Sequence, residues 1–575
     1  RGQRSSLPPF PPPCLKCLGP MEMEAEVPSG MQPGQTFTVQ TPNGLVPVKV
    51  PPDCFPGQRL RFPAPAPGQP PVLLGRLAPS PLPLAYAAAP VQRPVRAYRT
   101  DPLQARPDNC PLLQGVPVER AERKVGEIRK GGELARDHPI FPAARQCKDA
   151  VWIIPFVLVV ALVVVAAAFL SQDVVRKFEG KTGDLPMVGG MVLAGVGGGA
   201  ASMIAAGLYV VLAAAAPGCV VWTSLLFSPV LMVVAGLALI GGGQAALGAI
   251  CIAIGALSLS CVFCCFRPLI PFTITLVKAV ATVMKGRPAM VAVSFIGSVL
   301  GLVWSVVCSL AFVGAYLKYE NSAEEGSNVR YALYFFSVLI FVWGAQVVFN
   351  VCHVTYCGVF GRWYFATDER APVCKSLRVA MGTSFGSICL GSFLVAAIRA
   401  VEAFVRQARM EAQQEGNMCT CVVLMVLECI VACIGDILEF FSEWAYVQCA
   451  VRGVSFFEAA RITYSMMTCS NLFFVIQALL VNSVVNLGAL LCGIVGCAVG
   501  TGIGFAMGTQ AHAIAGAIIG LWAGLLAGGS AAGILSSGTK TLLVLWAEDP
   551  EPLRLSRPDI HNELEDRICR GLADS

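Results

Sequence analysis

The sequence has few charged residues. Lysine, arginine, aspartate and glutamate make up 14% of its 575 residues, against about 25% in an average soluble domain. The formal net charge is only +6, and the basic residues are spread over loops and the N-terminal region. The sequence therefore excludes an ordinary soluble domain and does not indicate a nucleic-acid-binding surface.

Catalytic and metal-binding motifs are also absent from the sequence. There are only four histidines, and no HExxH, Walker A or GxSxG pattern occurs. Cys14 and Cys17 form a CxxC without a second pair at zinc-site spacing. Nineteen of the 24 cysteines lie from Cys219 onward, mostly inside apolar runs, where cysteine packs as a small apolar residue. We therefore expect no enzymatic activity, no metal and no cofactor.

Long apolar runs dominate the rest of the chain. Hydrophobic residues make up 55% of it and the mean hydropathy is +0.65. A helix needs about 20 apolar residues to cross a membrane, and ten runs reach this length. The fold class predicted is an all-α polytopic membrane protein with about ten transmembrane helices. The runs are 151–170, 187–216, 219–240, 245–266, 288–316, 331–352, 379–401, 418–441, 471–500 and 509–536.

Loop charges predict the orientation. The segment 267–287 has four basic residues and no acid, whereas 317–330 has three glutamates and two bases. Since cytosolic loops are enriched in lysine and arginine, the first loop is expected inside and the second outside. Ten spans with a cytosolic N-terminus also place the C-terminus in the cytosol. The run 379–401 has arginines near both ends, so it is a span or a re-entrant or interfacial segment.

The sequence predicts four regions. They are a tail with a repeated module at 1–62, a cytosolic linker at 63–149, a transporter domain at 150–546 and a cytosolic tail at 547–575. The chain begins at Arg1, and Met21 is a candidate for the true start. Nothing before residue 150 has the apolar core of a signal peptide, so the first apolar run is expected to target the chain to the membrane.

A short repeat lies near the N-terminus. VPSGMQPGQTFTV at 27–39 and VPPDCFPGQRLRF at 50–62 share Pro-Gly-Gln followed by an alternating stretch, which predicts a small β-hairpin module. Residues 27–62 are a candidate contact for a cytosolic protein. The segment 63–118 is rich in proline and alanine, as disordered linkers are. The segment 119–148 has eight basic residues against five acidic ones, which favours contact with anionic membrane lipid.

An aromatic stretch, HVTYCGVFGRWYFA at 353–366, follows the sixth apolar run. On a helix, five of its side chains fall within an arc of about 100°. Aromatic faces attract organic cations, so this face, helped by Trp343, is a candidate substrate-binding cage. The alternative is an aromatic belt at the membrane interface. The five residues are His353, Tyr356, Phe360, Trp363 and Tyr364.

Acidic residues interrupt the eighth run. Glu428, Asp436, Glu439 and Glu443 fall within about 80° on a helical wheel. Acids at membrane depth are costly and indicate an ion or proton route, and we assign this route to the first three. Glu428 is expected to be the most buried, because only apolar residues and cysteine surround it. If the segment lies on the membrane surface instead, the stripe is simply solvated.

Glycines recur every four residues in the tenth run. Gly516, Gly520, Gly524 and Gly528 form one smooth helix face. Such a face predicts close contact with another helix.

Several stretches resemble one known family in the same order. They are ITLVKAVATVMKGRPA (274–289), HVTYCGVFGRWYF (353–365), TSFGSICLGSFLVAAIR (383–399), FFSEWAYVQCAVRGVSFFEAAR (440–461) and TKTLLVLWAEDPE (539–551). With these, residues 150–560 resemble the choline transporter-like family, and within it the fungal and plant-type branch of the yeast pH nine sensitive protein. The resemblance implies about ten spans, cytosolic termini and transport of choline or related amines across the plasma membrane or an organelle membrane, in some cases against protons. Residues 171–186 are too short for the large outer loop of animal members.

The residues and the family resemblance together leave two candidate functions. The first is secondary or facilitated transport of choline or another organic amine. The second is a non-transporting membrane scaffold that recruits cytosolic partners through the N-terminal region. The predicted partners are the amine and membrane lipids, and no nucleic acid.

Overall fold

The computed structural model describes six short strands and residues 132–574, apart from 183–184, 321–326, 368, 470–472 and 509. The chain divides into two compact units, Arg1–Arg106 and Pro107–Ser575. The first unit contains the strands and the second contains the helices.

The strands form two sheets of three, in the orders β1-β4-β6 and β2-β3-β5. β2 and β3 pair antiparallel, with Thr41 opposite Gly44, and β2 and β4 fall at the ends of the two repeat copies. The Pro-Gly-Gln turns of the repeat and most of the linker 63–118 lie outside the described residues, so the β-hairpin module and the disordered linker stay predictions. The strands are β1 (Glu22–Glu26), β2 (Thr36–Thr41), β3 (Gly44–Lys49), β4 (Arg59–Pro63), β5 (Leu73–Leu74) and β6 (Arg76–Leu77).

Ten helices in the described part of the chain are long and apolar enough to cross a membrane. Each of the ten predicted runs falls on one of them, which confirms the number of spans expected from the sequence. α6 is continued to Phe266 by the π-helical turn η2 (Val262–Phe266). The ten are α3 (Ile153–Thr182), α4 (Leu185–Ala215), α5 (Pro217–Gly241), α6 (Ala245–Cys261), α8 (Ala289–Glu320), α9 (Ser327–Tyr364), α11 (Phe385–Gln414), α12 (Met418–Arg452), α14 (Phe473–Ala506) and α15 (Gln510–Glu548).

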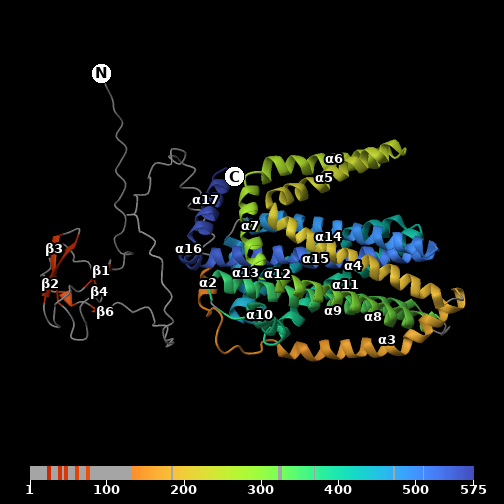
Figure 1. The fold of residues 1–575 in the computed structure, drawn as a ribbon, viewed down its shortest axis with the longest axis horizontal. Helices are drawn as coiled ribbons and strands as arrows, with labels where there is room; N and C mark the ends of the chain where they lie inside the picture. The colour runs from red at the N-terminus through yellow and green to blue at the C-terminus, as the bar shows by residue number, and fades with distance from the viewer. Residues whose placement is uncertain are drawn as a thin grey trace, which may run out of the picture. The chain divides into compact units, whose positions relative to one another are not determined.

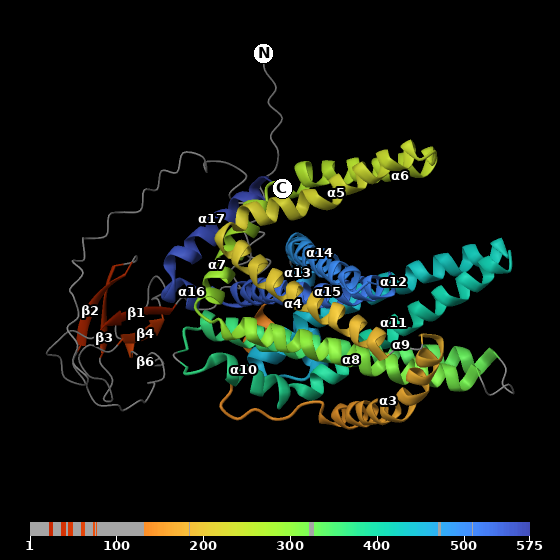
Figure 2. The same cartoon turned by 45° about the vertical axis from the view of Figure 1, so that its right-hand side comes forward.

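Shorter helices join and flank the spans. The predicted inner loop 267–287 is largely helical, since α7 occupies most of it and buries one apolar side. On its other side, Lys278 lies 3.7 Å from Glu563 on α17. Figures 1 and 2 show α7 running steeply across the direction of the neighbouring spans. The shorter elements are α2 (Glu133–Arg136), η1 (Ala150–Trp152), α7 (Ile270–Lys285), α10 (Pro372–Met381), α13 (Phe456–Cys469), α16 (Glu551–Ser556) and α17 (Pro558–Asp574).

α14 and α15 lie side by side in the middle of the helical unit, with α4 against both (Figures 1 and 2). The glycine face of α15 makes this approach close, as predicted. A Cβ placed on Gly528 would lie 2.7 Å from the carbonyl oxygen of Gly488 on α14, closer than van der Waals contact. Gly516 and Gly520 face the backbone of Gly500 and Gly496 in the same way.

Several helices extend beyond the apolar runs that predicted them, and three of these carry the candidate site. α9 continues to Tyr364 and so contains most of the aromatic stretch. α11 is one helix of 30 residues that ends at Gln414, and residues 379–381 belong to α10, so the role of 379–401 in the membrane stays a prediction. α12 continues to Arg452. These extensions place the aromatic, basic and acidic side chains of the candidate site on neighbouring helices.

Candidate functional site

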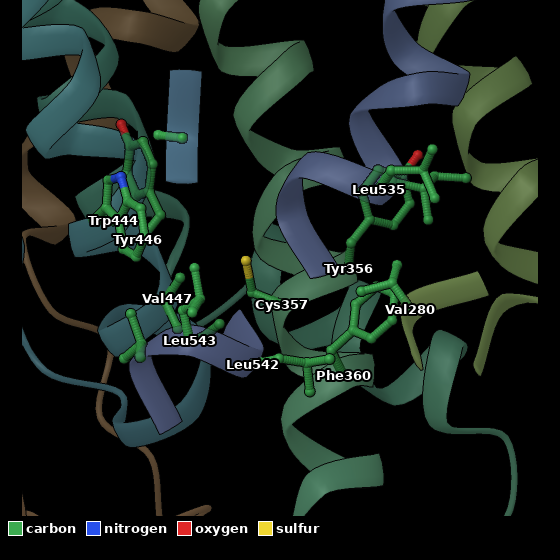
Figure 3. Close-up of a cluster of buried hydrophobic side chains, with 14 of the residues drawn as sticks. Val280, Tyr356, Cys357, Phe360, Trp444, Tyr446, Val447, Leu535, Leu542 and Leu543 are labelled. Carbon is green, nitrogen blue, oxygen red and sulfur yellow. The ribbon is translucent and has the colours of Figure 1, made fainter. Parts of the chain in front are cut away.

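The six predicted cage residues are all buried on α9. Trp343, His353, Tyr356, Phe360, Trp363 and Tyr364 expose 8% of their surface or less. Since they span six turns of the helix, they reach different neighbours. Figure 3 shows Tyr356 and Phe360 together, near Leu535 of α15 and Val280 of α7.

The other four cage candidates have separate partners. Trp343 donates from Nε1 to Cys389 O on α11 at 3.0 Å, and Tyr364 donates to Asp549 O at 2.7 Å. The guanidinium carbon of Arg557 lies 4.3 Å from the centre of the Trp363 ring, so an internal cation already covers that ring. The structure therefore brings Tyr356 and Phe360 together but not all six residues, and the cage stays a prediction.

His353 connects three helices. Its Nε2 lies 2.8 Å from Glu443 O on α12, and its Nδ1 lies 2.7 Å from Ser537 Oγ on α15. A carbonyl oxygen only accepts, so Nε2 carries the proton and donates to Glu443 O. The Ser537 hydroxyl also donates to Gly533 O at 2.8 Å. The neighbouring Tyr356 hydroxyl is different, because it is buried with no partner in hydrogen-bond geometry among the residues described.

The acidic stripe of α12 faces arginines of α11. Glu428 accepts from Arg406 Nε at 2.7 Å and from Arg409 Nε at 2.6 Å. Arg399 lies 2.6 Å from Asp436 and 2.7 Å from Glu439. α12 is one of the helices that can span the membrane, and its acids are paired by a neighbouring helix. The position of the stripe within the membrane or at its surface stays a prediction.

The acidic side chains of α12 differ in how far they are exposed. The side chain of Glu428 is 15% exposed, against 36% for Glu439 and 70% for Asp436. With Glu443 at 22%, Glu428 is the least exposed of the four acidic side chains of the stripe, and its place on a proton or cation route stays a prediction. The sequence explained this low exposure by the apolar neighbours of Glu428 alone. It did not show that two arginines of another helix, α11, also cover the carboxylate.

Further hydrogen bonds connect these ion pairs of α11 and α12 to polar side chains of α9 and α11. Glu439 accepts from Gln346 Nε2 at 3.1 Å, and Asn350 donates to Gln346 Oε1 at 3.4 Å and to Ser392 Oγ at 3.0 Å. Glu402 links the two arginines, lying 2.9 Å from Arg399 and 2.7 Å from Arg406. We call the resulting chain of side chains the polar track. Its members are Glu428, Arg409, Arg406, Glu402, Arg399, Asp436, Glu439, Gln346, Asn350 and Ser392.

Sequence reasoning missed two parts of this arrangement. Gln346, Asn350 and His353 recur at spacings of four and three within an apolar run, which places them on one helix face. Lys540 lies within the apolar α15, and its Nζ is 2.6 Å from Glu443 Oε2, with the lysine side chain 3% exposed. In both cases the sequence already showed the signal, which is a polar or charged residue within an apolar run.

The segment 132–149, here called the N-terminal strap, contacts the ends of α12 and α15. Arg136 donates to Glu548 O at 3.0 and 2.8 Å, Phe141 N donates to Val451 O at 3.0 Å, and Arg145 donates to the same oxygen at 2.9 Å. Burial, and then the nearby charge of Arg362, lowers the pKa of Arg145 to about 10, so it remains charged at neutral pH.

Asp149 ends the strap and fixes it to two further helices. Its Oδ2 accepts from Ser387 Oγ at 2.7 Å and from the backbone of Phe456 at 2.8 Å. The strap is therefore bound to the helical unit by side-chain and backbone hydrogen bonds along its length.

A cavity of about 680 Å³ lies between α8, α9 and the C-terminal end of α11. The sequence analysis did not identify it, because its walls come from three helices. Its lining residues are Phe312, Val313, Tyr316, Arg330, Tyr331, Leu333, Tyr334, Ser337, Gln407, Glu411, Gln414 and Glu415.

The geometry defines a multi-pass helical membrane protein with a charged, hydrogen-bonded track among its spans. The chain belongs to the choline transporter-like family, because the family model described as plasma-membrane choline transporter matches residues 250–551. The matched residues contain α8, α9, α11, α12, α14 and α15, and so both the polar track and the cavity.

Three similar proteins come from two fungi and a slime mould. A protein named PNS1 from Debaryomyces hansenii is 26% identical over 323 residues, which cover 53% of this chain and 63% of that protein. PNS1 of Saccharomyces cerevisiae is 31% identical over 218 residues, covering 35% and 40%. A CTL-like protein of Dictyostelium discoideum is 27% identical over 206 residues, covering 35% of each. The chain spans less than two thirds of the length of each of these relatives.

Proposed function

We propose that this chain transports choline or a related organic amine by secondary or facilitated transport, and that it does not act as an enzyme. The polar track is the observation that carries the proposal. Ion pairs and buried amides among membrane spans are costly to place, and they mark substrate or ion pathways. Family membership supports an organic amine as the class of substrate.

The charges of the track suit a cationic substrate. Four carboxylates, on Glu402, Glu428, Asp436 and Glu439, face the three guanidinium groups of α11. The track thus carries an excess of one negative charge, and a negative field among low-dielectric walls raises the local concentration of cations.

Glu443 provides a candidate exchange point deeper in the unit. Its carboxylate pairs with Lys540 at 2.6 Å, and its backbone oxygen accepts from His353. Tyr356 is the cage candidate whose buried hydroxyl has no partner in hydrogen-bond geometry among the described residues. In our proposal, a substrate ammonium replaces the Lys540 ammonium at Glu443 and packs against the aromatic face of α9.

Proton coupling is the finer part of the proposal. Glu428, Asp436 and Glu439 form the proton or cation route, because they recur along one face of α12. We also propose that the chain lies in the plasma membrane with both termini in the cytosol, as the basic segment 267–287 favours.

Uptake of radiolabelled choline into proteoliposomes, with and without a pH gradient, tests this function. We expect uptake that saturates and that increases when the gradient drives protons outward against inward choline. Uptake equal to that of protein-free liposomes would contradict transport. Saturable uptake that ignores the gradient would contradict only the proton coupling.

The scaffold function is the second candidate, and the separate compact unit Arg1–Arg106 favours it. A deletion of residues 1–131 distinguishes the two functions while it preserves the strap contacts of Arg136 and Asp149. A transporter keeps most of its choline flux after this deletion. A scaffold loses its cellular phenotype and shows no choline flux before or after the deletion.

A further inference from the structure

The cavity between α8, α9 and α11 has the size of a small-molecule site. Its volume of about 680 Å³ falls within the usual range of about 300–1,000 Å³ for ligand pockets. A small quaternary amine fits with room for a substituent or for water.

Aromatic rings from two helices line this cavity. Tyr316 of α8 and Tyr334 of α9 are 46% and 37% exposed, and Tyr331 lies one turn before Tyr334. The guanidinium carbon of Arg330 lies 5.5 Å from the centre of the Tyr331 ring. An internal cation thus already occupies a cation–π position at the edge of the cavity.

Glu411, one of the two carboxylates of the cavity, has only neutral hydrogen-bond partners. Glu411 accepts from Tyr331 Oη at 2.5 Å and from Gln407 Nε2 at 3.0 Å. Neither Glu411 nor Glu415 forms an ion pair with any residue in the described part of the chain. These two carboxylates therefore carry negative charge without a salt-bridge partner among the residues described, while the charge of Arg330 at the edge of the cavity acts on Glu411 from a distance.

The position of these carboxylates on α11 is unfavourable without a cation. They stand four residues apart, where like charges repel across one helix turn. They also lie at the C-terminal end of the helix, where the backbone dipole disfavours negative charge. A bound cation relieves both repulsions, and the helix end attracts it further.

We propose that this cavity binds the organic ammonium substrate, with Tyr316, Tyr331 and Tyr334 around the cation and Glu411 as its counter-charge. The choice of an amine rests on the proposed function. The location rests on the cavity, its rings and its unpaired carboxylates.

Equilibrium binding of radiolabelled choline to the purified full-length protein in nanodiscs tests the proposal. We expect Tyr334→Ala to weaken binding about 2-fold to 30-fold, as loss of one cation–π contact does, and Tyr334→Phe to bind like the wild type. Glu411→Gln should weaken binding, and Arg330→Gln should strengthen it by removing a competing charge. The uncharged isostere 3,3-dimethylbutan-1-ol should not compete.

Matched controls lie outside the cavity. Tyr464→Ala on α13 and Glu551→Gln on α16 remove the same kinds of side chain, and neither residue lines the cavity, so both should bind choline normally. If Glu411→Gln fails to fold, the comparison of Tyr334→Ala with Tyr334→Phe still decides. Wild-type affinity in folded Tyr334→Ala, or equal competition by the isostere, would overturn the proposal.

The two proposals fail separately. Choline binding that depends on Tyr334, without choline flux in proteoliposomes, overturns transport and leaves the cavity site standing. Choline flux with unchanged affinity in Tyr334→Ala and Glu411→Gln overturns the cavity site and leaves transport standing.

Discussion

Arg452 and Glu548 form an ion pair inside the protein, with Nη2 2.7 Å from Oε2 and side chains only 3% and 1% exposed. Gln448 donates to the same carboxylate, and Arg452 also donates to His138 O in the N-terminal strap. The pair therefore joins the ends of α12 and α15 to the strap, and its partners satisfy most of the polar atoms that burial would otherwise leave unpaired.

Removing one member of this pair should destabilise the protein strongly. Glu548→Ala leaves the Arg452 guanidinium buried without its counter-charge, which costs about 3–5 kcal/mol. We expect a clearly lower thermal unfolding midpoint in detergent. The exposed pair Arg554–Glu551 is the control, because Glu551→Ala should change the midpoint little. Equal midpoints for the two variants would contradict the structural role of Glu548.

Lys540 and Glu443 allow stability and transport to be separated. Lys540→Met leaves the Glu443 carboxylate without the cation 2.6 Å away, and we expect lower stability, again by about 3–5 kcal/mol. In the double variant Lys540→Met with Glu443→Gln no unpaired charge remains, so most of the stability should return. Choline uptake should stay low, since the carboxylate is gone. Full uptake in the stable double variant would remove Glu443 from the substrate route.

Trp363 tests the predicted aromatic cage. The cage hypothesis predicts that Trp363→Ala weakens choline uptake at unchanged abundance in the membrane. The Arg557 guanidinium carbon lies 4.3 Å from the centre of its ring. If the ring only holds Arg557 in place, Arg557→Ala and Trp363→Ala should reduce choline uptake equally. Reduced uptake in Trp363→Ala alone, measured at equal protein abundance, supports the cage. The same loss in both variants places the cage elsewhere.

The sequence predicted local features well and contacts between helices poorly. Ten spans were evident, because an apolar run of about 20 residues is a property of one segment. The glycine face of α15 was evident for the same reason. The low exposure of Glu428 was expected, but Arg406 and Arg409 were taken only as charges that flank the run 379–401. Their pairing depends on the side-by-side placement of α11 and α12, which no single segment encodes.

The cavity illustrates the same limit. Tyr331 and Tyr334 were counted within an apolar run, and Glu411 belonged to no motif. Each becomes informative only when α8, α9 and α11 come together. In the aromatic stretch of α9 the sequence predicted a single site from one helix face. The neighbouring helices instead give Trp343 and Trp363 different partners.

Glu369 should make stability depend on pH. Burial raises the pKa of this carboxyl, but hydrogen bonds and charge from Arg362 and Lys375 outweigh it and hold the pKa below the ordinary value of 4.5. Folding thus favours the ionised form, so the contribution is complete above pH 4.5 and is lost as the pH falls through the lowered pKa. The difference in unfolding midpoint between wild type and Glu369→Gln should be constant near neutrality and shrink in acid. A difference that grows in acid would contradict this.

Gly528 and Gly529 offer a matched pair on α15. A Cβ on Gly528 would lie 2.7 Å from Gly488 O, whereas one on Gly529 would meet Ala489 Cβ at an ordinary 3.9 Å. Alanine favours a helix over glycine by about 1 kcal/mol at either position, so intrinsic propensity cancels in the comparison. We expect Gly529→Ala to match or exceed the wild-type unfolding midpoint, and Gly528→Ala to fall below it because α14 and α15 must separate. Equal midpoints for the two variants would mean that α14 and α15 do not pack as closely as the structure has them.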